Sequence, residues 1–469
     1  MIYKRWIYLG GVALCALFLA GCVEPPRVMA PSVAHLPEAF STQGTVSLPQ
    51  KWWESLNDPQ LNTVMEEALA GNLTIRMAWD RLRQAEALAD QATSFLLPSL
   101  TYSGMGRRTR RDTNNTTTSA SDYRLGLGAS YEIDLWGRAR SAYDATLLDA
   151  QARQEDMASA AMTVSASVAK LWYQLAETKQ TLAVMQQQLE TNRRVYKLVL
   201  LHFRNSKVGV GAPDVLRQKQ LVESTQGQLI QARERQVLLQ HALAVLLGKP
   251  AGQWDPPEAM LIELPVLPAV GVPSEVLQRR PDVRSVWLAV QSADARVAIA
   301  ITDKYPSLSL SANVDTTSTH MKDLFDDWLA SLAANVAGPL FDAGRRQAEV
   351  ERTRAVVSQL LNQYGQTVLE ALQDVEDALV REQQQTRYLA SLQSQLTLAR
   401  AVTQKTEKRY KLGAADYLRI LDALRTEQQL EIGELAAQRL LLDHRIDLCR
   451  SIAGSWDMER PDRESIDQH

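Results

Sequence analysis

The chain has 469 residues, a formal net charge of −3, and 45% hydrophobic and 22% charged residues. A charge this close to balance gives no electrostatic basis for binding nucleic acid, so we expect no such partner. Of the three cysteines, Cys15 and Cys22 lie in an N-terminal processing signal, and Cys449 would be the only free thiol. An intramolecular disulfide is therefore excluded, and stability must come from packing.

Residues 1–21 are typical of a signal peptide. Lys4 and Arg5 precede an apolar stretch, residues 6–20, that is too short for a comfortable membrane span. Leu-Ala-Gly at 19–21 precedes Cys22, a pattern at which a signal peptidase cuts after the thiol has received a lipid. We expect Cys22 to be the acylated first residue of a lipoprotein, and Val23 after it fits the outer membrane. The alternative is an ordinary signal peptide that happens to contain a cysteine.

The mature sequence reads as two copies of one unit. Leu-Pro-Ser-Leu at 97–100 recurs as Tyr-Pro-Ser-Leu at 305–308, and Asp214 recurs as Asp422, both 208 positions on. We therefore predict a tether at 22–58, a first repeat at 59–248, a Pro-rich linker at 249–273, a second repeat at 274–454 and a flexible tail at 455–469. One such unit cannot bury its apolar faces alone.

Each repeat changes its hydrophobic period along its length. The first begins with a helix, about 59–95, and continues with a β-hairpin at 99–133 whose polar connection spans 107–121. The second has its hairpin at 306–340. The strands alternate between apolar and polar residues, which is typical of a strand with one apolar face.

Strands of about ten residues with one apolar face suit a membrane barrel. Four strands cannot close one, so two copies would supply eight and three would supply twelve. A soluble two-stranded flap is the alternative reading of each hairpin.

Two long helices follow the hairpins, at 138–204 and 345–411. Along each long helix a seam of mostly apolar residues recurs at steps of three and four positions. The seam extends from Leu171 to Phe203 in the first helix and from Val368 to Leu396, through Thr386 and Gln393, in the second. This spacing is a coiled-coil period. Each long helix ends in a turn and returns as a second helix, at 214–247 and 416–453. The alternative is an ordinary rod-like coiled coil.

The motifs together resemble those of the TolC-like outer-membrane efflux factors, in particular the NodT-type lipoprotein branch. The matching segments cover essentially the whole mature chain: 52–53, 56–61, 131–138, 279–283, 305–308, 339–345 and 410–413. The fold class expected is mainly α with a membrane β-barrel.

The resemblance implies a homotrimer that shares a twelve-stranded barrel continuous with a periplasmic helical tunnel. It also implies a periplasmic adaptor and an inner-membrane transporter of the resistance-nodulation-division type as partners, beside outer-membrane lipid. The chain would be a passive exit duct of a tripartite efflux pump, lipid-anchored in the outer membrane and extending into the periplasm. A duct for type I protein secretion and a structural coiled-coil lipoprotein or adhesin are the alternatives.

The candidate gate lies on the helix after the second turn. Leu418, Asp422 and Arg425 are spaced i, i+4 and i+7 and so share one face. In the resembled family this face lines the closed end of the tunnel, so rings of these residues would form a dry constriction locked by ion pairs. Asp214 and Arg217 repeat the spacing in the first copy. The alternative is a simple exposed ion pair in each copy.

The turns are the expected adaptor contacts, with small apolar tips that pack and lysines that steer. They comprise Lys207, Val208, Gly209, Val210 and Gly211 in the first turn and Lys411, Leu412, Gly413 and Ala414 in the second. The alternative is that the glycines are present only because they let the chain reverse, and both interpretations can hold.

Arg107, Arg108, Arg110 and Arg111 cluster beside the first hairpin loop, as a solvated loop or as partners for lipid phosphates. No phosphate-binding loop, His-Glu-x-x-His or Gly-x-Ser-x-Gly motif is present, so we expect no catalytic site, no metal and no cofactor besides the lipid on Cys22.

Overall fold

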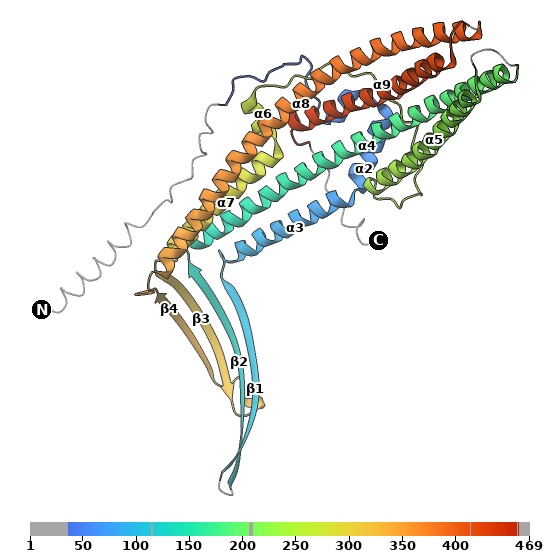
Figure 1. Ribbon diagram of the computed structural model, residues 1–469. Helices are drawn as coiled ribbons and strands as arrows, with labels where there is room; N and C mark the ends of the chain where they lie inside the picture. The colour runs from blue at the N-terminus through green and yellow to red at the C-terminus, as the bar shows by residue number, and fades with distance from the viewer. Residues whose placement is uncertain (1–35, 114–115, 206–209, 413, 457, 459–469) are drawn as a thin grey trace. The chain divides into compact units, whose positions relative to one another are not determined.

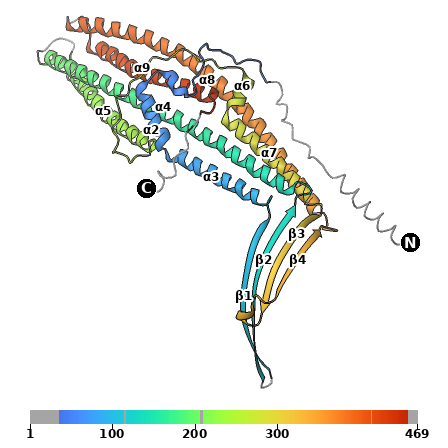
Figure 2. The same ribbon diagram turned by 180° about the vertical axis from the view of Figure 1, so that it is seen from behind.

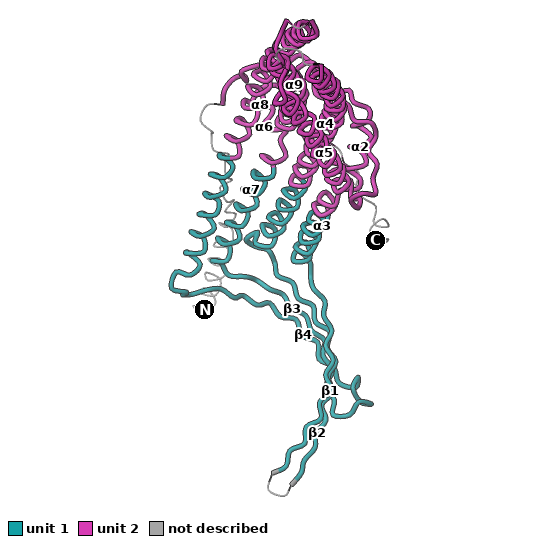
Figure 3. The backbone as a smooth tube through the Cα atoms, turned by 45° about the vertical axis from the view of Figure 1, so that its right-hand side comes forward, with its two compact units in different colours: residues 1–33, 80–154, 285–366 teal, residues 34–79, 155–284, 367–469 magenta. Residues whose placement is uncertain are grey.

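The computed structural model describes residues 36–113, 116–205, 210–412, 414–456 and 458. The described residues form two compact units (Figure 3). Unit 1 comprises the described parts of 80–154 and 285–366, and unit 2 those of 34–79, 155–284 and 367–469. Each unit therefore contains segments from both halves of the sequence. The signal peptide and Cys22 lie outside the described residues.

Unit 1 contains a four-stranded antiparallel sheet in the order β1-β2-β3-β4 (Figure 1). The strands are β1 (Ser99–Thr113), β2 (Thr116–Ile133), β3 (Ser307–Ser318) and β4 (Trp328–Ala337). The two hairpins join through β2 and β3, where Tyr131 lies opposite Leu310. β1 and β4 are the edges of this sheet, and each leaves one row of backbone groups without a strand partner in the described chain.

The expectation of a polar connection over 107–121 is wrong. β1 and β2 continue as a two-stranded ladder in which Arg107 lies opposite Asp122 and Arg111 opposite Thr118. The apolar alternation ends near Gly106 because both faces become polar beyond it, whereas the backbone ladder needs no apolar face to continue. The four arginines therefore lie within β1 and not beside it.

The sheet has one apolar and one polar face, because side chains at alternate positions share a face. The apolar face comprises Leu100, Tyr102, Tyr123, Leu125, Leu127, Tyr131, Ile133, Leu308, Leu310, Val314, Leu332 and Val336. Tyr102 and Leu332 are 88% and 82% exposed in the single chain. On the polar face, Gly126 leaves room for Asp315, since a Cβ at Gly126 would lie 2.4 Å from the Asp315 Oδ1 atom.

Both long helices of the chain begin directly after this sheet, each at an aspartate that caps it. Asp134 accepts hydrogen bonds from the backbone N–H groups of Ala139 and Arg140 at 3.1 and 2.9 Å. Asp342 accepts from the backbone N–H groups of Gly344 and Arg346 at 3.1 and 3.3 Å. The caps satisfy N–H groups that a helix start leaves unpaired, so they fix where each helix begins.

The remaining contacts of unit 1 hold its helices together. Val297 of α7 (Pro281–Thr302) packs with Val357 of α8 (Arg345–Lys411) in a small apolar cluster. The Ser292 hydroxyl lies 2.6 Å from an oxygen of Asp149 on α4 (Arg138–Arg204). Trp136 stacks on Tyr305 at 4.8 Å, so the start of α4 is attached to the entrance of β3.

Two helices are present where one was expected at 59–95. α2 (Pro59–Gly71) and α3 (Leu73–Ser94) are separated by Asn72, which is extended at φ −67° and ψ 121°. Asn72 caps α3 and donates to the Leu246 carbonyl at 2.8 Å. Gly71 lies so close to the Leu247 carbonyl that a Cβ would approach its oxygen to 2.3 Å. The break is therefore imposed by a contact that is distant in sequence.

Two helices of 67 residues, α4 and α8, dominate the chain and match the expected ranges. At 1.5 Å per residue each is about 100 Å long. α5 (Ala212–Leu246) returns beside α4, and α9 (Tyr417–Ile452) returns beside α8 (Figures 1 and 2). The predicted apolar seam is partly wrong, because Phe203, Thr386 and Gln393 are exposed in the single chain.

The N-terminal segment lies along unit 2 from residue 36 onward. Phe40 is buried among residues of α8 and α9, including Val375 and Leu448. Val46 forms an isolated parallel bridge with Pro268 of the linker. Residues 249–272 contain no helix or strand apart from this bridge, and α6 (Pro273–Arg279) follows them.

The expected flexible tail is wrong for Trp456, which is buried and packs edge-on against Trp53 at 5.0 Å. Burial of a large aromatic side chain stabilises the end of the chain in place. Residues 459–469 lie outside the described part. Among the described helices, none combines the length and the apolar character that a membrane span requires.

Candidate functional site

The candidate gate residues share the exposed side of α9, as their spacing predicts. Leu418 is 52% exposed, and Asp422 and Arg425 are exposed as well. Ile420, Leu421, Ala423 and Leu424 between them are buried, whereas Arg419 is exposed. Within the described chain neither Asp422 nor Arg425 forms an ion pair, so both charges remain available to groups outside it.

Asp214 and Arg217 lie at the start of α5 and form an ion pair of 3.8 Å. The Asp214 carboxylate also accepts a hydrogen bond from the Gly211 backbone N–H at 2.9 Å. This is a helix cap, because the side chain satisfies an N–H group that the helix start leaves free. The simple ion pair expected as an alternative is therefore present here, and α9 differs from α5 in lacking its counterpart.

The ends of the two helical hairpins share one apolar core. Val199 of α4, Leu221 of α5, Tyr410 of α8 and Ile420 of α9 belong to a single buried cluster. The structure thus brings the starts of α5 and α9 together in one core. A rigid core beneath the exposed face of α9 fixes the direction in which Leu418 and Asp422 point.

A chain of buried hydrogen bonds crosses this core and was not predicted. The Tyr417 hydroxyl donates to Gln218 Oε1 at 2.9 Å, and Gln218 Nε2 donates to the Asn192 carbonyl at 3.0 Å. Asn192 Nδ2 donates in turn to the Thr225 hydroxyl at 3.0 Å. Asn192 and Gln218 have no exposed surface. Three helices, α4, α5 and α9, are therefore joined by polar contacts as well as by packing.

The chain of bonds continues along α9. Gln428 Nε2 donates to Asn192 Oδ1 at 2.9 Å, and Gln188 Nε2 donates to Glu431 at 2.9 Å. Glu431 also pairs with Arg400 of α8 at 3.4 Å. The only signal in the sequence was the polar Asn192 in an apolar seam, since Gln218 and Gln428 are unremarkable glutamines on helices.

Two tyrosines in this core differ in their hydrogen bonding. Burial raises the pKa of both phenols, to about 12 for Tyr410, where the charge of Asp214 adds to the effect. Tyr417 has the Gln218 partner, whereas the Tyr410 hydroxyl is buried without one in the described structure. Both phenols therefore stay neutral at physiological pH, and only Tyr417 contributes a hydrogen bond.

The turns themselves are described only in part. Val210, Gly211, Lys411, Leu412 and Ala414 are placed, while Lys207, Val208, Gly209 and Gly413 lie outside the described residues. Leu412 is 76% exposed. The α8–α9 turn therefore presents an apolar side chain to its surroundings.

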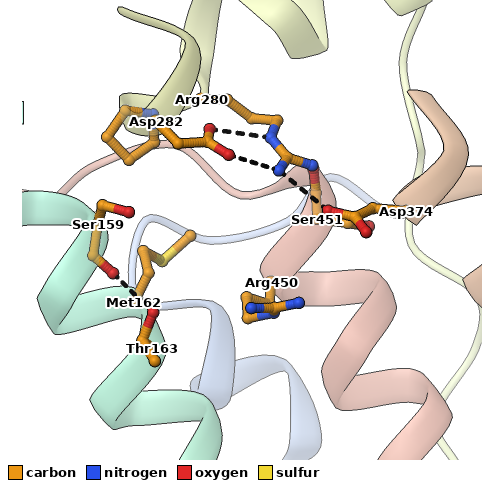
Figure 4. Close-up of a pocket in the computed structure, with 9 residues that line it drawn as sticks. Ser159, Met162, Thr163, Arg280, Asp282, Asp374, Arg450 and Ser451 are labelled. Atoms are coloured by element: carbon orange, nitrogen blue, oxygen red, sulfur yellow. Dashed lines mark hydrogen bonds and ion pairs between the residues drawn. The ribbon is translucent and has the colours of Figure 1, made fainter. Parts of the chain in front are cut away.

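Arg280 lies beside a small cavity of about 50 Å³ in unit 2 (Figure 4). Its five N–H groups are all donated: two to Asp282, one to Asp374 and one each to the Ala371 and Ser451 carbonyls. Burial disfavours the ionised form of Asp282, but the hydrogen bonds from Arg280 outweigh it and hold the pKa of Asp282 below its usual value. Because no donor is left over, Arg280 joins α7, α8 and α9 and does not hold an anion.

Comparison with known proteins agrees with the resemblance seen in the sequence. The family model described as "Outer membrane efflux protein" matches residues 64–249 and 272–454. The pyoverdine export outer membrane protein OpmQ of Pseudomonas putida is 29% identical over 99% of this chain and 100% of its own length.

Two solved structures have the same fold. The outer-membrane channel OprN superposes with a TM-score of 0.84 at 26% identity, over 93% of this chain and 100% of that one. The open state of the Neisseria gonorrhoeae MtrE outer membrane channel superposes with a TM-score of 0.81 at 27% identity, over 92% of this chain and 98% of that one. The resemblance seen in the sequence is confirmed: the chain belongs to the outer membrane efflux protein family, whose members are transport ducts and not enzymes.

Proposed function

We propose that this chain is one of three identical subunits of a passive exit duct in the outer membrane. The duct opens at the starts of α5 and α9 and receives its cargo from a periplasmic adaptor and an inner-membrane transporter of the resistance-nodulation-division type. The observation that carries the proposal is the sheet of unit 1, which has an apolar face and two edges without strand partners.

The sheet cannot be stable in lipid as a single copy. Every unpaired backbone group in hydrocarbon costs several kcal/mol, so a membrane sheet must close on itself. Four strands are too few, since membrane barrels begin at eight. Three copies give twelve strands, which is the number that the resemblance to the TolC-like efflux factors implies, whereas two copies would give eight.

Closure of the barrel would bury β1 of one copy against β4 of the next. The apolar face would then form a continuous outer surface in contact with lipid, and the polar face with Asp315 would line the lumen. This arrangement explains why large side chains such as Tyr102 and Leu332 are exposed in the single chain.

The gate is proposed at the exposed face of α9. Three copies of Leu418 would narrow the duct, and Asp422 and Arg425, which find no ion-pair partner in their own described chain, would pair across subunits. Exposed ion pairs contribute roughly 0–1 kcal/mol each, so a ring of them is weak enough for an adaptor to open. MtrE has been described in an open state, which supports a duct that changes state.

The N-terminus is proposed to carry lipid on Cys22. In the described segment after this anchor, Phe40 is buried against residues of α8 and α9. Mass spectrometry of the mature chain tests the lipid directly: we expect acylation of the wild-type chain and none in Cys22→Ser. Acylation that persists in the variant would contradict the assignment.

Subunit number is tested by native mass spectrometry of the protein extracted from outer membranes. We expect a species of three chains that survives mild detergent. A monomer that nevertheless exports a fluorescent efflux substrate from cells would contradict the shared barrel. The same cells, with and without the chain, report whether export depends on it.

A further inference from the structure

The arginines of β1 divide between the two faces of the sheet. β1 alternates regularly against β2, with Arg107 opposite Asp122, Arg108 opposite Ser121 and Arg110 opposite Ser119. Because alternate residues share a face, Arg108 and Arg110 lie on the apolar face that carries Leu100 and Tyr102. Arg107 and Arg111 lie on the opposite, polar face.

The two faces also differ in how their charges are matched. On the polar face, Arg107 and Arg124 both pair with Asp122, at 3.6 and 3.1 Å. On the apolar face, Arg108 and Arg110 have serine hydroxyls opposite them and no carboxylate partner in the described chain. The next residue on that face, Asp112, accepts a hydrogen bond from Thr117. Two guanidinium groups are therefore left to groups outside the protein.

The position of these arginines along the strand is equally specific. Arg108 is nine residues beyond Ser99, where β1 begins. At about 3.3 Å per residue and a tilt of about 40°, nine residues rise about 23 Å along a barrel axis, close to the 25 Å height of a lipid-facing apolar band. Tyr123, opposite Gly106, lies just below and is an aromatic residue of the kind found at membrane interfaces.

We propose that Arg108 and Arg110 form a binding site for the phosphate groups of anionic lipid in the outer leaflet. The inference rests on the proposed barrel, which turns the apolar face toward lipid. Guanidinium groups bind phosphate oxygens in a bidentate manner, and the hydroxyls of Ser119 and Ser121 lie beside them as further hydrogen-bond donors. The site would hold the long β1–β2 hairpin at the membrane surface.

The matched variants are available on the same strand. Arg108→Gln with Arg110→Gln removes the two outward charges, and Arg107→Gln with Arg111→Gln removes two charges from the other face. The purified full-length protein is titrated with bis-phosphorylated lipid A, with the same lipid lacking its phosphates, and with inorganic phosphate. Conductance of each protein in a neutral bilayer is measured in parallel.

We expect the outward pair of substitutions to weaken binding of the phosphorylated lipid about 25-fold, at about 1 kcal/mol for each arginine. The pair on the polar face should leave binding within about twofold, and removal of the lipid phosphates should abolish the difference. Conductance of the outward variant should equal that of the wild type.

Three results would overturn the inference: equal weakening by both pairs, no weakening by the outward pair, or equal affinity for inorganic phosphate. If any one of these results is found while the wild-type protein conducts, only the lipid site is contradicted. If the wild-type protein neither conducts nor forms a trimer, the proposed duct fails and the lipid site falls with it.

Discussion

The Tyr417 hydroxyl of α9 donates to Gln218 of α5 across 2.9 Å, and both side chains are almost entirely buried. The bond joins two residues that are 199 positions apart in the sequence. It lies directly beside Leu418, so any movement of the α9 face away from α5 must break it. The arrangement of α5 and α9 at this end of the helices is thereby tied to one identifiable hydrogen bond.

Tyr417→Phe should loosen the ends of the helices. The substitution leaves Gln218 Oε1 buried without a donor, which costs about 1–3 kcal/mol. We expect a lower melting temperature and more frequent channel openings in planar bilayers.

Tyr410→Phe is the matched control, because it removes a buried hydroxyl that has no partner in the described structure. It should leave stability unchanged or slightly raised. Equal effects of the two substitutions would show that the Tyr417 bond has no special role.

The strand register between neighbouring subunits follows from the proposed repeat. β2 pairs with β3 so that Ala129 lies opposite Ala312. In the second hairpin, Val336 occupies the place that Ala129 has in the first. Gly104 lies 208 positions before Ala312 and is therefore its equivalent in the first repeat. Val336 should thus lie opposite Gly104 of the next copy. Val336→Cys with Gly104→Cys should give disulfide-linked trimers under mild oxidation.

Val336→Cys with Met105→Cys is the control for this register. A shift of one residue turns the second thiol to the other face of the sheet, so cross-linking should fall sharply. Preferential cross-linking of the Met105 pair would contradict both the register and the repeat on which it is based.

Arg280→Lys should destabilise unit 2 strongly. Lysine keeps the charge but cannot form the five hydrogen bonds that Arg280 donates, and it would leave Asp282 and two carbonyls with fewer partners. Disruption of a buried charged pair costs about 3–5 kcal/mol. Arg279→Lys, at an exposed neighbouring side chain, should change the melting temperature little. Similar losses in both variants would contradict the role of Arg280.

The stability of the protein should depend on pH through Asp443. Burial raises the pKa of Asp443 to about 6 from 3.8, and the charges of Arg439 and Lys170 only partly oppose this. Because the folded state holds this proton more tightly than the unfolded state, the carboxyl stabilises the fold below pH 4 and loses that contribution as the pH rises through 6. Asp443→Asn should therefore gain about 1–3 kcal/mol relative to the wild type between pH 4 and pH 8.

Denaturant unfolding at several pH values measures this difference. Asp377→Asn provides the comparison, because Asp377 is 45% exposed and pairs with Arg381 on the surface of α8. Its difference from the wild type should stay within about 1 kcal/mol, because an exposed ion pair contributes roughly 0–1 kcal/mol. A difference for Asp443→Asn that does not change with pH would contradict the prediction.

The elements that could be predicted from sequence are those with a local periodic signal. Leu125, Leu127 and Tyr131 alternate with polar residues, and the structure has β2 there. The absence of proline and glycine from 139–205, and of proline between Pro339 and Pro461, predicted helices that the structure describes as α4 and α8, with the expected ends. The spacing of Leu418, Asp422 and Arg425 predicted one face of α9 in the same way.

The features that were missed depend on contacts between distant residues. Asn72 interrupts a continuous helical pattern because it binds the Leu246 carbonyl, 174 positions away. Trp456 follows the last helix without any local signal and is held by Trp53. Gln218 joins Tyr417 only once α5 and α9 lie together. No period in the sequence encodes such pairs.

The most direct test of the gated duct is the single-channel conductance of the purified protein, with Asp422→Ala beside Glu427→Ala. Asp422 lies on the proposed gate face, whereas Glu427 lies about 140° away on the same helix. We predict a small wild-type conductance that rises several-fold in Asp422→Ala and stays unchanged in Glu427→Ala. A wild-type conductance that neither substitution alters would contradict the gate, and the absence of conductance in folded protein would contradict the duct.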